Sequence, residues 1–256
     1  MTDSPGLSIL MYHQVGEFAP MKAHRANYCD RRQFAHQMAF LDRFGYSVLG
    51  LEEALSCLSG ERPTPSRAVV LTFDDAYDNF ADHALPVLQR HGFPAVLYAI
   101  GGWLGRGAEW FGKDPGRPIP TLMSGERLRS MRSAGITVGS HTLNHVKLAE
   151  VDRAAKAREL SESKSALEDV LGEPVEHLCY PFGSFDLETV HLAAEAGYRS
   201  ATTCLRGAAT SLDHPLVLPR KAISYGDNLA GYWWKLAIKN APKPALAEWR
   251  ATLARR

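Results

Sequence analysis

The sequence predicts an α/β fold built around one mostly parallel sheet, and three observations lead to this class. Short apolar runs alternate with longer amphipathic segments, as in repeated strand–helix units. The run Ala68–Phe73 is almost continuously apolar, which is typical of a strand covered on both faces. Polar side chains follow several of these runs and would meet at one edge of the sheet. The alternation leaves two architectures open, a (β/α) barrel and an open doubly wound sheet.

Each expected strand combines an apolar run with a polar or turn-forming end. In the first, Leu7, Ile9, Met11 and His13 alternate with other residues and would therefore face the same side. The last is interrupted by Pro219, which cannot donate to a sheet. The expected strands span 7–13, 68–73, 95–100, 137–140, 177–180, 200–204 and 216–223.

The expected helices lie between these strands and mostly end at glycines. Pro86 lies inside one of them and predicts a kink. Residues 101–120 are rich in glycine and proline and form an expected long loop, whose aromatic residues Trp103, Trp110 and Phe111 could stack on a sugar or anchor the loop. The expected helices span 30–45, 51–58, 78–90, 124–134, 152–171 and 186–196.

The bulk properties indicate a single catalytic domain over residues 1–256. With 29 basic and 28 acidic residues the formal net charge is +1, which argues against a nucleic-acid-binding surface. The four cysteines are widely spaced and match no zinc or redox pattern, which indicates free thiols. The first residues do not read as a secretory signal, and no apolar run approaches the length of a membrane span. We therefore expect a cytoplasmic protein.

Residues 227–256 form a basic, aromatic helical extension of this domain. Tyr232, Trp233 and Trp234 stand among several lysines and arginines. One interpretation is a helix that lies on an anionic membrane surface. The other is a pair of helices that pack their aromatic face on the barrel, which is the more common role of such a stripe.

Two adjacent carboxylates, Asp74 and Asp75, directly follow the strand 68–73. They repel each other unless a cation or a proton separates their roles. His141 and His145 follow another strand, and their spacing lets both imidazoles converge. Two nitrogens and one carboxylate oxygen suit a first-row divalent metal and leave positions open for water and substrate. We expect Asp75, His141 and His145 to bind this metal, with zinc favoured and cobalt, nickel, manganese or iron as alternatives.

The remaining candidates supply acid, base and oxyanion chemistry. Asp74 would accept a proton from metal-bound water. Backbone N–H groups of the segment that contains Tyr180, Phe182 and Gly183 could stabilise an oxyanion, with Phe182 favoured because the proline before it has no N–H. His13, at the end of the first strand, is available as general acid. Such a site would hydrolyse an amide or an ester.

Each candidate also has a plain structural interpretation. Asp74 and Asp75 could cap the helix that follows them. His141 and His145 could be ordinary core or surface histidines. The combination of a carboxylate pair and a histidine pair, each at a strand end, favours the metal site over these readings.

Three motifs carry a resemblance to a known family. Thr72-Phe73-Asp74-Asp75, His141-Thr142-x-x-His145 and Tyr180-Pro181-Phe182-Gly183 resemble, in this order, the motifs of the polysaccharide deacetylase family, also called carbohydrate esterase family four. The resemblance covers roughly residues 7–225. It implies a distorted, TIM-like (β/α) barrel of about seven strands. It also implies Asp74 as base, Asp75 and both histidines as metal ligands, and removal of N-acetyl or sometimes O-acetyl groups from sugars.

Two positions depart from the common family pattern. Many members carry a late Leu-x-Leu-x-His motif that supplies the acid, and nothing after His191 matches it. The segment 9–13 resembles this motif moved to the N-terminus, as in a circularly permuted branch, which implies His13 as acid. Cys179 stands where many members have an arginine that orients the base, and Arg220 resembles the replacement found in the permuted branch.

The hypothesis is a metal-dependent hydrolase that removes an acetyl group from an N-acetylated sugar in glycan or glycoconjugate biosynthesis. Metal-bound water would attack the amide carbonyl, with Asp74 as base and His13 as acid. The sugar could be lipid-linked or nucleotide-linked. Two alternatives stay open: a hydrolase of a non-sugar C–N bond, such as a ureide or cyclic imide, and a catalytically silent carbohydrate-binding module. Nothing in the sequence predicts the oligomeric state.

Overall fold

The computed structural model describes residues 6–113 and 118–254. The strands of its main sheet are β1 Ser8–Tyr12, β4 Ser47–Val48, β5 Ala68–Phe73, β6 Val96–Ala99, β7 Thr137–Ser140, β8 His177–Cys179, β9 Ser200–Thr202 and β10 Lys221–Ala222. Two short strands, β2 Gln14–Gly16 and β3 Tyr28–Asp30, pair separately. The α-helices are α1 Arg31–Arg43, α2 Leu51–Leu58, α3 Leu85–His91, α4 Gly125–Ser133, α5 Arg153–Leu171, α6 Leu187–Glu195, α7 Leu229–Ala237 and α8 Pro244–Leu253.

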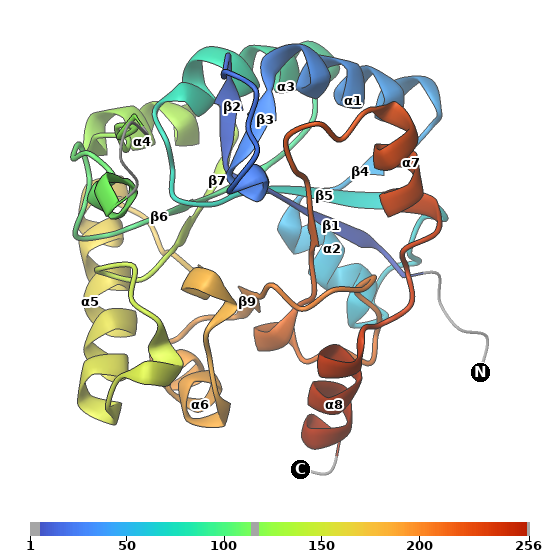
Figure 1. Ribbon diagram of the computed structural model, residues 1–256. Coiled ribbons are helices and arrows are strands. Elements are labelled where there is room, and N and C mark those ends of the chain that lie inside the picture. The colour runs from blue at the N-terminus through green and yellow to red at the C-terminus, as the bar shows by residue number, and fades with distance from the viewer. Residues whose placement is uncertain (1–5, 114–117, 255–256) are drawn as a thin grey trace.

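The main sheet is curled and parallel, and the helices surround it (Figure 1). Its strands follow the order β10-β1-β5-β6-β7-β8-β9, and β4 pairs with the start of β5. Parallel strands place all their carboxyl ends at one rim, which is where polar residues follow β1, β5, β7 and β8. The predicted distorted (β/α) barrel of about seven strands is confirmed.

Local sequence signals explain most element boundaries. The Asp30 side chain accepts hydrogen bonds from the first backbone N–H groups of α1, and Ser124 and Asp186 do the same for α4 and α6. Gly92 ends α3 in the left-handed conformation that glycine adopts without a Cβ penalty. The expected helices and strands therefore occur close to their predicted positions.

The expected kink at Pro86 takes the form of a π-helical turn. Residues Phe80–Ala84 are π-helical, and Pro86 lies in the first turn of the α-helix that follows. A proline is tolerated there because the N–H groups of a first turn have no intrahelical acceptor. The expected helix 78–90 is therefore two helical segments.

The expected strand 216–223 is wrong in its extent, and the reason is Pro219. Before the proline, Leu218 bridges to Thr202 of β9 in parallel. After it, Lys221 pairs with Leu10 of β1. A proline cannot continue a hydrogen-bonded ladder, so the chain changes partner at this point. This closing segment, residues 218–222, therefore pairs with β9 at its start and, as β10, with β1 at its end.

Sequence patterns alone do not predict several short elements of the structure. The short strands β2, β3 and β4 have too few residues to show a period, and the sequence did not predict them. The expected loop 101–120 contains a 3-10 turn, Glu109–Lys113, and its residues 114–117 lie outside the described part of the chain.

The C-terminal extension packs on the barrel with one face and leaves the other exposed. In α7, Tyr232 is fully buried and lies against Phe40 of α1, while Trp233 and Trp234 are about half exposed. In α8, Trp249 stacks on Phe185. Packing on the barrel thus explains Tyr232 and Trp249 but not the exposed parts of Trp233 and Trp234. Contact of this extension with a membrane surface stays a prediction. Within residues 6–113 and 118–254, no helix combines the length and apolarity that crossing a membrane requires.

Candidate metal centre and active site

The two histidines lie on a loop that β7 delivers to the rim. The N–H of His141 donates to the Ala99 carbonyl of β6, which continues the strand pairing up to the histidine. The loop then turns through Thr142 and His145, both in the left-handed backbone region. The Thr142 hydroxyl accepts a hydrogen bond from the His145 N–H at 3.2 Å. This turn, rather than a helix, makes the two imidazoles converge.

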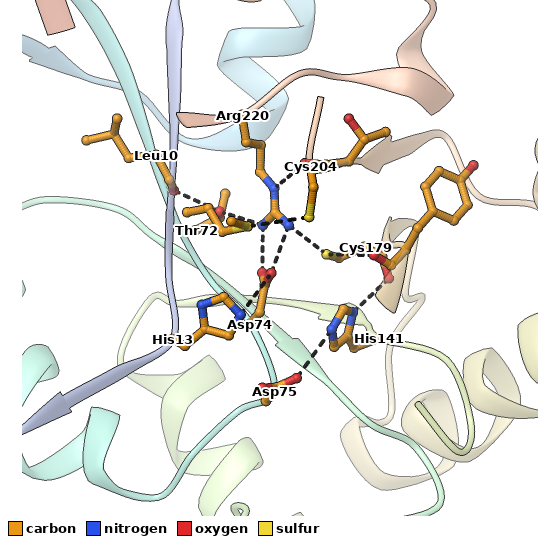
Figure 2. Close-up of polar contacts among 12 residues, drawn as sticks. Leu10, His13, Thr72, Asp74, Asp75, His141, Cys179, Cys204 and Arg220 are labelled. Atoms are coloured by element: carbon orange, nitrogen blue, oxygen red, sulfur yellow. Dashed lines mark hydrogen bonds and ion pairs between the residues drawn. The ribbon is translucent and has the colours of Figure 1, made fainter. Parts of the chain in front are cut away.

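Asp75 meets both histidines at the rim. Its Oδ1 lies 3.3 Å from Nε2 of His141 (Figure 2). The same oxygen lies 3.3 Å from Nε2 of His145. These three atoms lie within 4.8 Å of one another, so one ion could contact all of them. The structure brings together the three residues that the sequence predicts as metal ligands.

The tautomer of His141 suits a metal ligand. Its Nδ1 lies 2.7 Å from the carbonyl oxygen of Cys179. A carbonyl can only accept, so Nδ1 carries the proton and Nε2 is the nitrogen that faces Asp75. A ligating histidine usually donates its other N–H to such an acceptor, which fixes the ring.

The protonation states of Asp75 and His145 also fit a cation. Burial by itself raises the pKa of Asp75, but the imidazoles of His145 and His141 bring it far below its usual range. Burial lowers the pKa of His145 to about 4, and the nearby Asp75 offsets this only in part. At neutral pH Asp75 is therefore anionic and His145 neutral, which are the forms that bind a metal. Burial by itself lowers the pKa of His141, but Cys179 and Asp75 raise it well above its ordinary value, so metal binding at His141 would release a proton.

A second group of potential ligands, Asp74, His141 and Cys179, fits a cation less well. Both carboxylate oxygens of Asp74 accept hydrogen bonds from Arg220, and so does the sulfur of Cys179. The guanidinium charge in the middle of this group would repel a cation. Asp75, His141 and His145 are the set whose chemistry fits a divalent metal.

Asp74 is held by Arg220 in a bidentate ion pair. The guanidinium donates from Nη1 to Oδ1 at 2.6 Å and from Nη2 to Oδ2 at 2.8 Å, and both side chains are buried (Figure 2). Arg220 also donates to the Thr203 carbonyl and to the Thr72 hydroxyl. Burial by itself raises the pKa of Asp74, but the Arg220 guanidinium holds it below its ordinary value. Asp74 is therefore ionised and fixed in orientation.

His13 lies on the open side of Asp74. Its Nε2 is 3.9 Å from Oδ2 of Asp74, and the side chain keeps 16% exposure. The other ring nitrogen, Nδ1, is buried and has no hydrogen-bond partner among the described residues. The first strand thus brings His13 to the same rim as the residues that follow β5 and β7.

The segment 180–183 offers fewer free donors than the sequence suggests. The N–H of Tyr180 donates to Thr202, and the N–H of Gly183 donates to the Tyr180 carbonyl. The Tyr180 ring is buried, and its hydroxyl donates to the Leu216 carbonyl. Phe182 is in the left-handed region and the residue is 56% exposed, and its N–H makes no hydrogen bond within the described residues. Phe182 is therefore the available backbone donor of this segment.

The aromatic residues of the loop 101–120 were predicted either to stack on a sugar or to anchor the loop, and the structure supports a different role for different residues. The ring of Trp110 lies 4.6 Å from that of His145, and Phe182 contacts the same imidazole at the same centroid distance. Phe111, in contrast, is fully buried and anchors the loop. Trp103 packs against Trp110. Only Trp110 of the three borders the metal site directly.

Sequence reasoning missed Glu159, which holds the histidine loop from α5. Its two carboxylate oxygens accept hydrogen bonds from the backbone and side-chain N–H groups of Asn144, each at 2.8 Å. The carboxylate is buried although it lies on a long, mostly polar helix. Asn144 between the two histidines was the only signal for this contact. A second missed contact is the Cys179 sulfur, 3.0 Å from Nη2 of Arg220.

Backbone strain is concentrated around these residues. Six non-glycine residues in the described chain have positive φ, and five of them are Asp75, Ala76, Thr142, His145 and Phe182. This conformation is costly for residues with a Cβ and persists only where the surrounding structure enforces it. Residue type explains this only in part: Asp and His are enriched in this conformation among non-glycine residues, whereas Ala, Thr and Phe are not.

A parallel half-barrel with two histidines and a carboxylate at its carboxyl rim, beside a second, ionised carboxylate, defines a class of metal-dependent hydrolases. Comparisons with known proteins identify the family within this class. The family described as polysaccharide deacetylase matches residues 61–201, more than half of the chain. The chain belongs to this family, whose members are metal-dependent carbohydrate deacetylases.

Individual relatives agree with this assignment. YxkH of Bacillus subtilis (strain 168), whose name places it provisionally among the polysaccharide deacetylases, is 28% identical over 227 residues, 88% of this chain and 74% of its own. A poly-β-1,6-N-acetyl-D-glucosamine N-deacetylase of Staphylococcus aureus (strain MRSA252) is 23% identical over 84% of this chain and 78% of its own. The solved Streptococcus pyogenes deacetylase PplD, in complex with acetate, shares the fold with a TM-score of 0.77 and 24% identity, over 90% of this chain and 98% of its own.

Proposed function

We propose that this chain removes the acetyl group from N-acetylated sugar residues of a glycan. The observation that carries the proposal is the convergence of Asp75, His141 and His145 beside Asp74, which Arg220 holds ionised. The name of the Staphylococcus aureus relative supports N-acetylglucosamine as the sugar. The sequence-based expectation that the sugar is lipid-linked or nucleotide-linked stays a prediction, beside the polymeric substrate that the relative's name suggests.

Asp75, His141 and His145 would hold a divalent metal, and two imidazoles with one carboxylate support zinc. When bound, such a metal supplies Lewis acidity to the substrate carbonyl and lowers the pKa of water in the site. Glu159 and the Cys179 carbonyl keep the histidine loop and the His141 ring in place. Residues that would not touch the metal thus hold the metal-binding side chains in position.

Asp74 is the base in this proposal. Its carboxylate is ionised at neutral pH and can take a proton from the attacking water. Arg220 occupies both oxygens on one side, so the remaining lone pairs face the rim and His13. The ion pair fixes the direction of proton transfer and lowers the basicity of Asp74 to some degree.

His13 would donate a proton to the leaving sugar amine. It lies on the rim beside Asp74 and is partly open to solvent, so a substrate nitrogen can reach it. The free N–H of Phe182 would stabilise the negative charge that develops on the carbonyl oxygen. The Trp110 and Phe182 rings flank His145 and offer apolar surface to the sugar face.

The test combines metal content with acetate release from a panel of N- and O-acetylated sugars and non-sugar ureides and cyclic imides. We expect acetate release from N-acetylglucosamine oligomers, loss of it on chelation, and its return when zinc is added. Equal acetate release from the demetallated protein would refute the metal role. Turnover confined to ureides or imides, or sugar binding without any acetate release, would establish one of the two alternatives instead.

A further inference from the structure

A second cavity lies on the outer side of the closing segment, away from the residues proposed for catalysis. It has a volume of about 660 Å³ and is lined by the segment after β9, by β10, and by α7 with the turn that follows it. Backbone hydrogen bonds between Lys243 and Arg206 and between Ala208 and Asn240 join two of these walls. None of the nine residues proposed for the active site lines it.

The lining of this cavity is strongly basic. Its charged residues are five cations, namely Arg206, Lys221, Lys235, Lys239 and Lys243. Asp227 neutralises Lys235, to which it is bound in an ion pair. Arg206, Lys239 and Lys243 form no ion pair within residues 6–113 and 118–254. The chain as a whole has a net charge of only +1, so this is a local concentration of positive charge.

Lys221 is the unusual member of this group because it is buried without a counter-ion. Only 4% of the residue is exposed, and its ammonium donates to the Ser8 hydroxyl at 2.8 Å and to Oδ1 of the Asn240 side-chain amide at 2.6 Å. An ammonium has three N–H donors, so two neutral partners leave one unsatisfied. Burial lowers the pKa of Lys221 to about 8, which is the mark of a charge that lacks compensation.

The alternation of β10 explains why two neighbouring cations have different surroundings. Arg220 directs its guanidinium to Asp74, while the neighbouring Lys221 binds Ser8 and Asn240 instead and is one of the residues that line the cavity. Arg220 has a carboxylate partner, whereas Lys221 has none within residues 6–113 and 118–254. An anion from outside would satisfy Lys221.

The same cavity carries exposed apolar surface. Trp234 and Ile238 line it, and each keeps 48% exposure although both are large apolar side chains. Pro242 lies beside them in the lining. Cations next to a half-exposed indole suit a ligand that joins an anionic group to an apolar one.

We propose that this cavity binds the phosphate group of a phosphate ester whose apolar part lies against Trp234 and Ile238. Lys221, Lys239, Lys243 and Arg206 supply the charge-assisted hydrogen bonds that a phosphate accepts. The ester can be soluble or can be a lipid headgroup at a membrane surface, because both present the same group. The proposal concerns a binding site separate from the metal centre and does not depend on deacetylation.

Calorimetric titration of the full chain with hexyl phosphate at fixed ionic strength tests the proposal. We expect one site, with hexyl phosphate bound more tightly than inorganic phosphate and hexanol bound weakly or not at all. The double variant Lys239→Ala/Lys243→Ala should weaken binding about tenfold or more, since each charge-assisted hydrogen bond contributes on that scale. Lys221→Met, which keeps the size of the buried side chain, should weaken it similarly.

The matched control is Arg43→Ala/Arg90→Ala, which removes two exposed charges that do not line the cavity and form no ion pair within the described residues. It should bind hexyl phosphate as the parent chain does. Absence of binding, equal weakening by both double variants, or equal affinity for hexanol would each overturn the proposal. Thermal unfolding of each variant distinguishes lost binding from lost structure.

Vesicle co-sedimentation identifies the source of the phosphate. If phosphatidylglycerol-containing vesicles retain the parent chain and not the Lys239→Ala/Lys243→Ala variant, while phosphatidylcholine vesicles retain neither, the ligand is a lipid headgroup. If hexyl phosphate binds and no vesicle does, the ligand is a soluble phosphate ester. Vesicle retention that is unaffected by the lysine substitutions, with no hexyl phosphate binding, would contradict the phosphate site.

Discussion

At the scale of single residues, the adjacent carboxylates Asp74 and Asp75 have entirely different partners. Asp74 faces Arg220 and His13, and Asp75 faces His141 and His145. The left-handed backbone of Asp75 contributes to this divergence, because it turns the chain immediately after the strand. Two like charges can lie side by side here because each has its own positive or polarisable neighbours.

The substitution Asp74→Asn should remove the base and leave the metal ligands intact. Asparagine cannot accept the proton of an attacking water, so we expect turnover to fall by about 10²- to 10⁴-fold. Metal content should stay that of the parent chain, because Asp75 and both histidines are unchanged. Acetate release and metal analysis of the same sample check both parts. Parent-like turnover with full metal would show that Asp74 is not the base.

The substitution Arg220→Met should destabilise the fold and change its pH dependence. It leaves the buried Asp74 carboxylate without its partner, which costs about 3–5 kcal/mol of unfolding free energy at neutral pH. Without the guanidinium, burial raises the pKa of Asp74. The variant carboxylate then takes up a proton at a higher pH than the parent, so the stability difference should shrink as the pH falls through the raised pKa.

Urea unfolding of both proteins from neutral to acidic pH measures this effect. The double substitution Asp74→Asn/Arg220→Met is the control, because it removes both charges and should recover part of the lost stability. A difference between parent and Arg220→Met that stays constant with pH would show that the ion pair with Asp74 is not its cause.

At the scale of elements, strand ends and tight packing position the site. β7 ends at Ser140, directly before His141, and its Gly139 lies under the ring of Tyr98. A Cβ at this glycine would be 2.6 Å from Cδ1 of Tyr98 and 2.8 Å from the His177 carbonyl oxygen. β7 can therefore lie this close to its neighbours only because position 139 has no side chain.

The substitution Gly139→Ala should destabilise the fold by about 1–3 kcal/mol, because backbone or a buried ring would have to move. Because the strain lies two residues before His141, we also expect weaker metal binding. Gly231→Ala in α7 is the control: its Cβ would have ordinary contacts, and alanine favours a helix by up to ~1 kcal/mol. The midpoint of urea unfolding and a metal titration, measured for Gly139→Ala and Gly231→Ala, check both expectations. Equal stability of both variants would contradict the packing argument.

At the scale of the whole molecule, the C-terminal helices belong to the packed structure of the barrel. Leu246 of α8 is fully buried and lies against Gly207, and Tyr232 of α7 reaches the Tyr12 hydroxyl of β1. The stack of Trp249, Phe185 and Tyr180 connects α8 with the segment after β8. The prediction of one domain over residues 1–256 can therefore be tested through α8.

The substitution Leu246→Ala should lower the unfolding free energy by about 2–5 kcal/mol, the usual cost of a cavity at a buried leucine. If α8 is part of one domain, the whole protein should unfold in a single transition at a lower urea concentration. Ile238→Ala, at a half-exposed position, should change stability by less than about 0.5 kcal/mol. An early, separate transition in the Leu246→Ala variant would instead identify residues 227–256 as an independent unit.

Sequence patterns were sufficient for the barrel class because strand–helix alternation and capping residues act locally. Asp30, Ser124 and Asp186 cap helices that begin close to their predicted positions, and the apolar run at 68–73 forms the buried strand β5. The family motifs likewise indicated Asp74, Asp75, His141 and His145 before their positions were known. The closing segment was beyond such reasoning, because its change of partner at Pro219 depends on where β9 and β1 lie in space.

The sequence by itself determined the chemistry that is available: two carboxylates, two histidines, His13 and Arg220, each near the end of a strand. The family motifs further implied that Asp75 joins the histidines and that Arg220 orients Asp74. The tertiary structure alone decided the contacts through which these residues meet, and that Lys221 beside Arg220 is buried with only neutral partners among the described residues. The reason is that residue type and local spacing fix helices and strands, whereas these contacts join distant positions, 146 residues apart for Asp74 and Arg220 and 213 for Ser8 and Lys221. Such contacts form only when the parallel sheet has curled and residues 218–222 have paired with both β9 and β1.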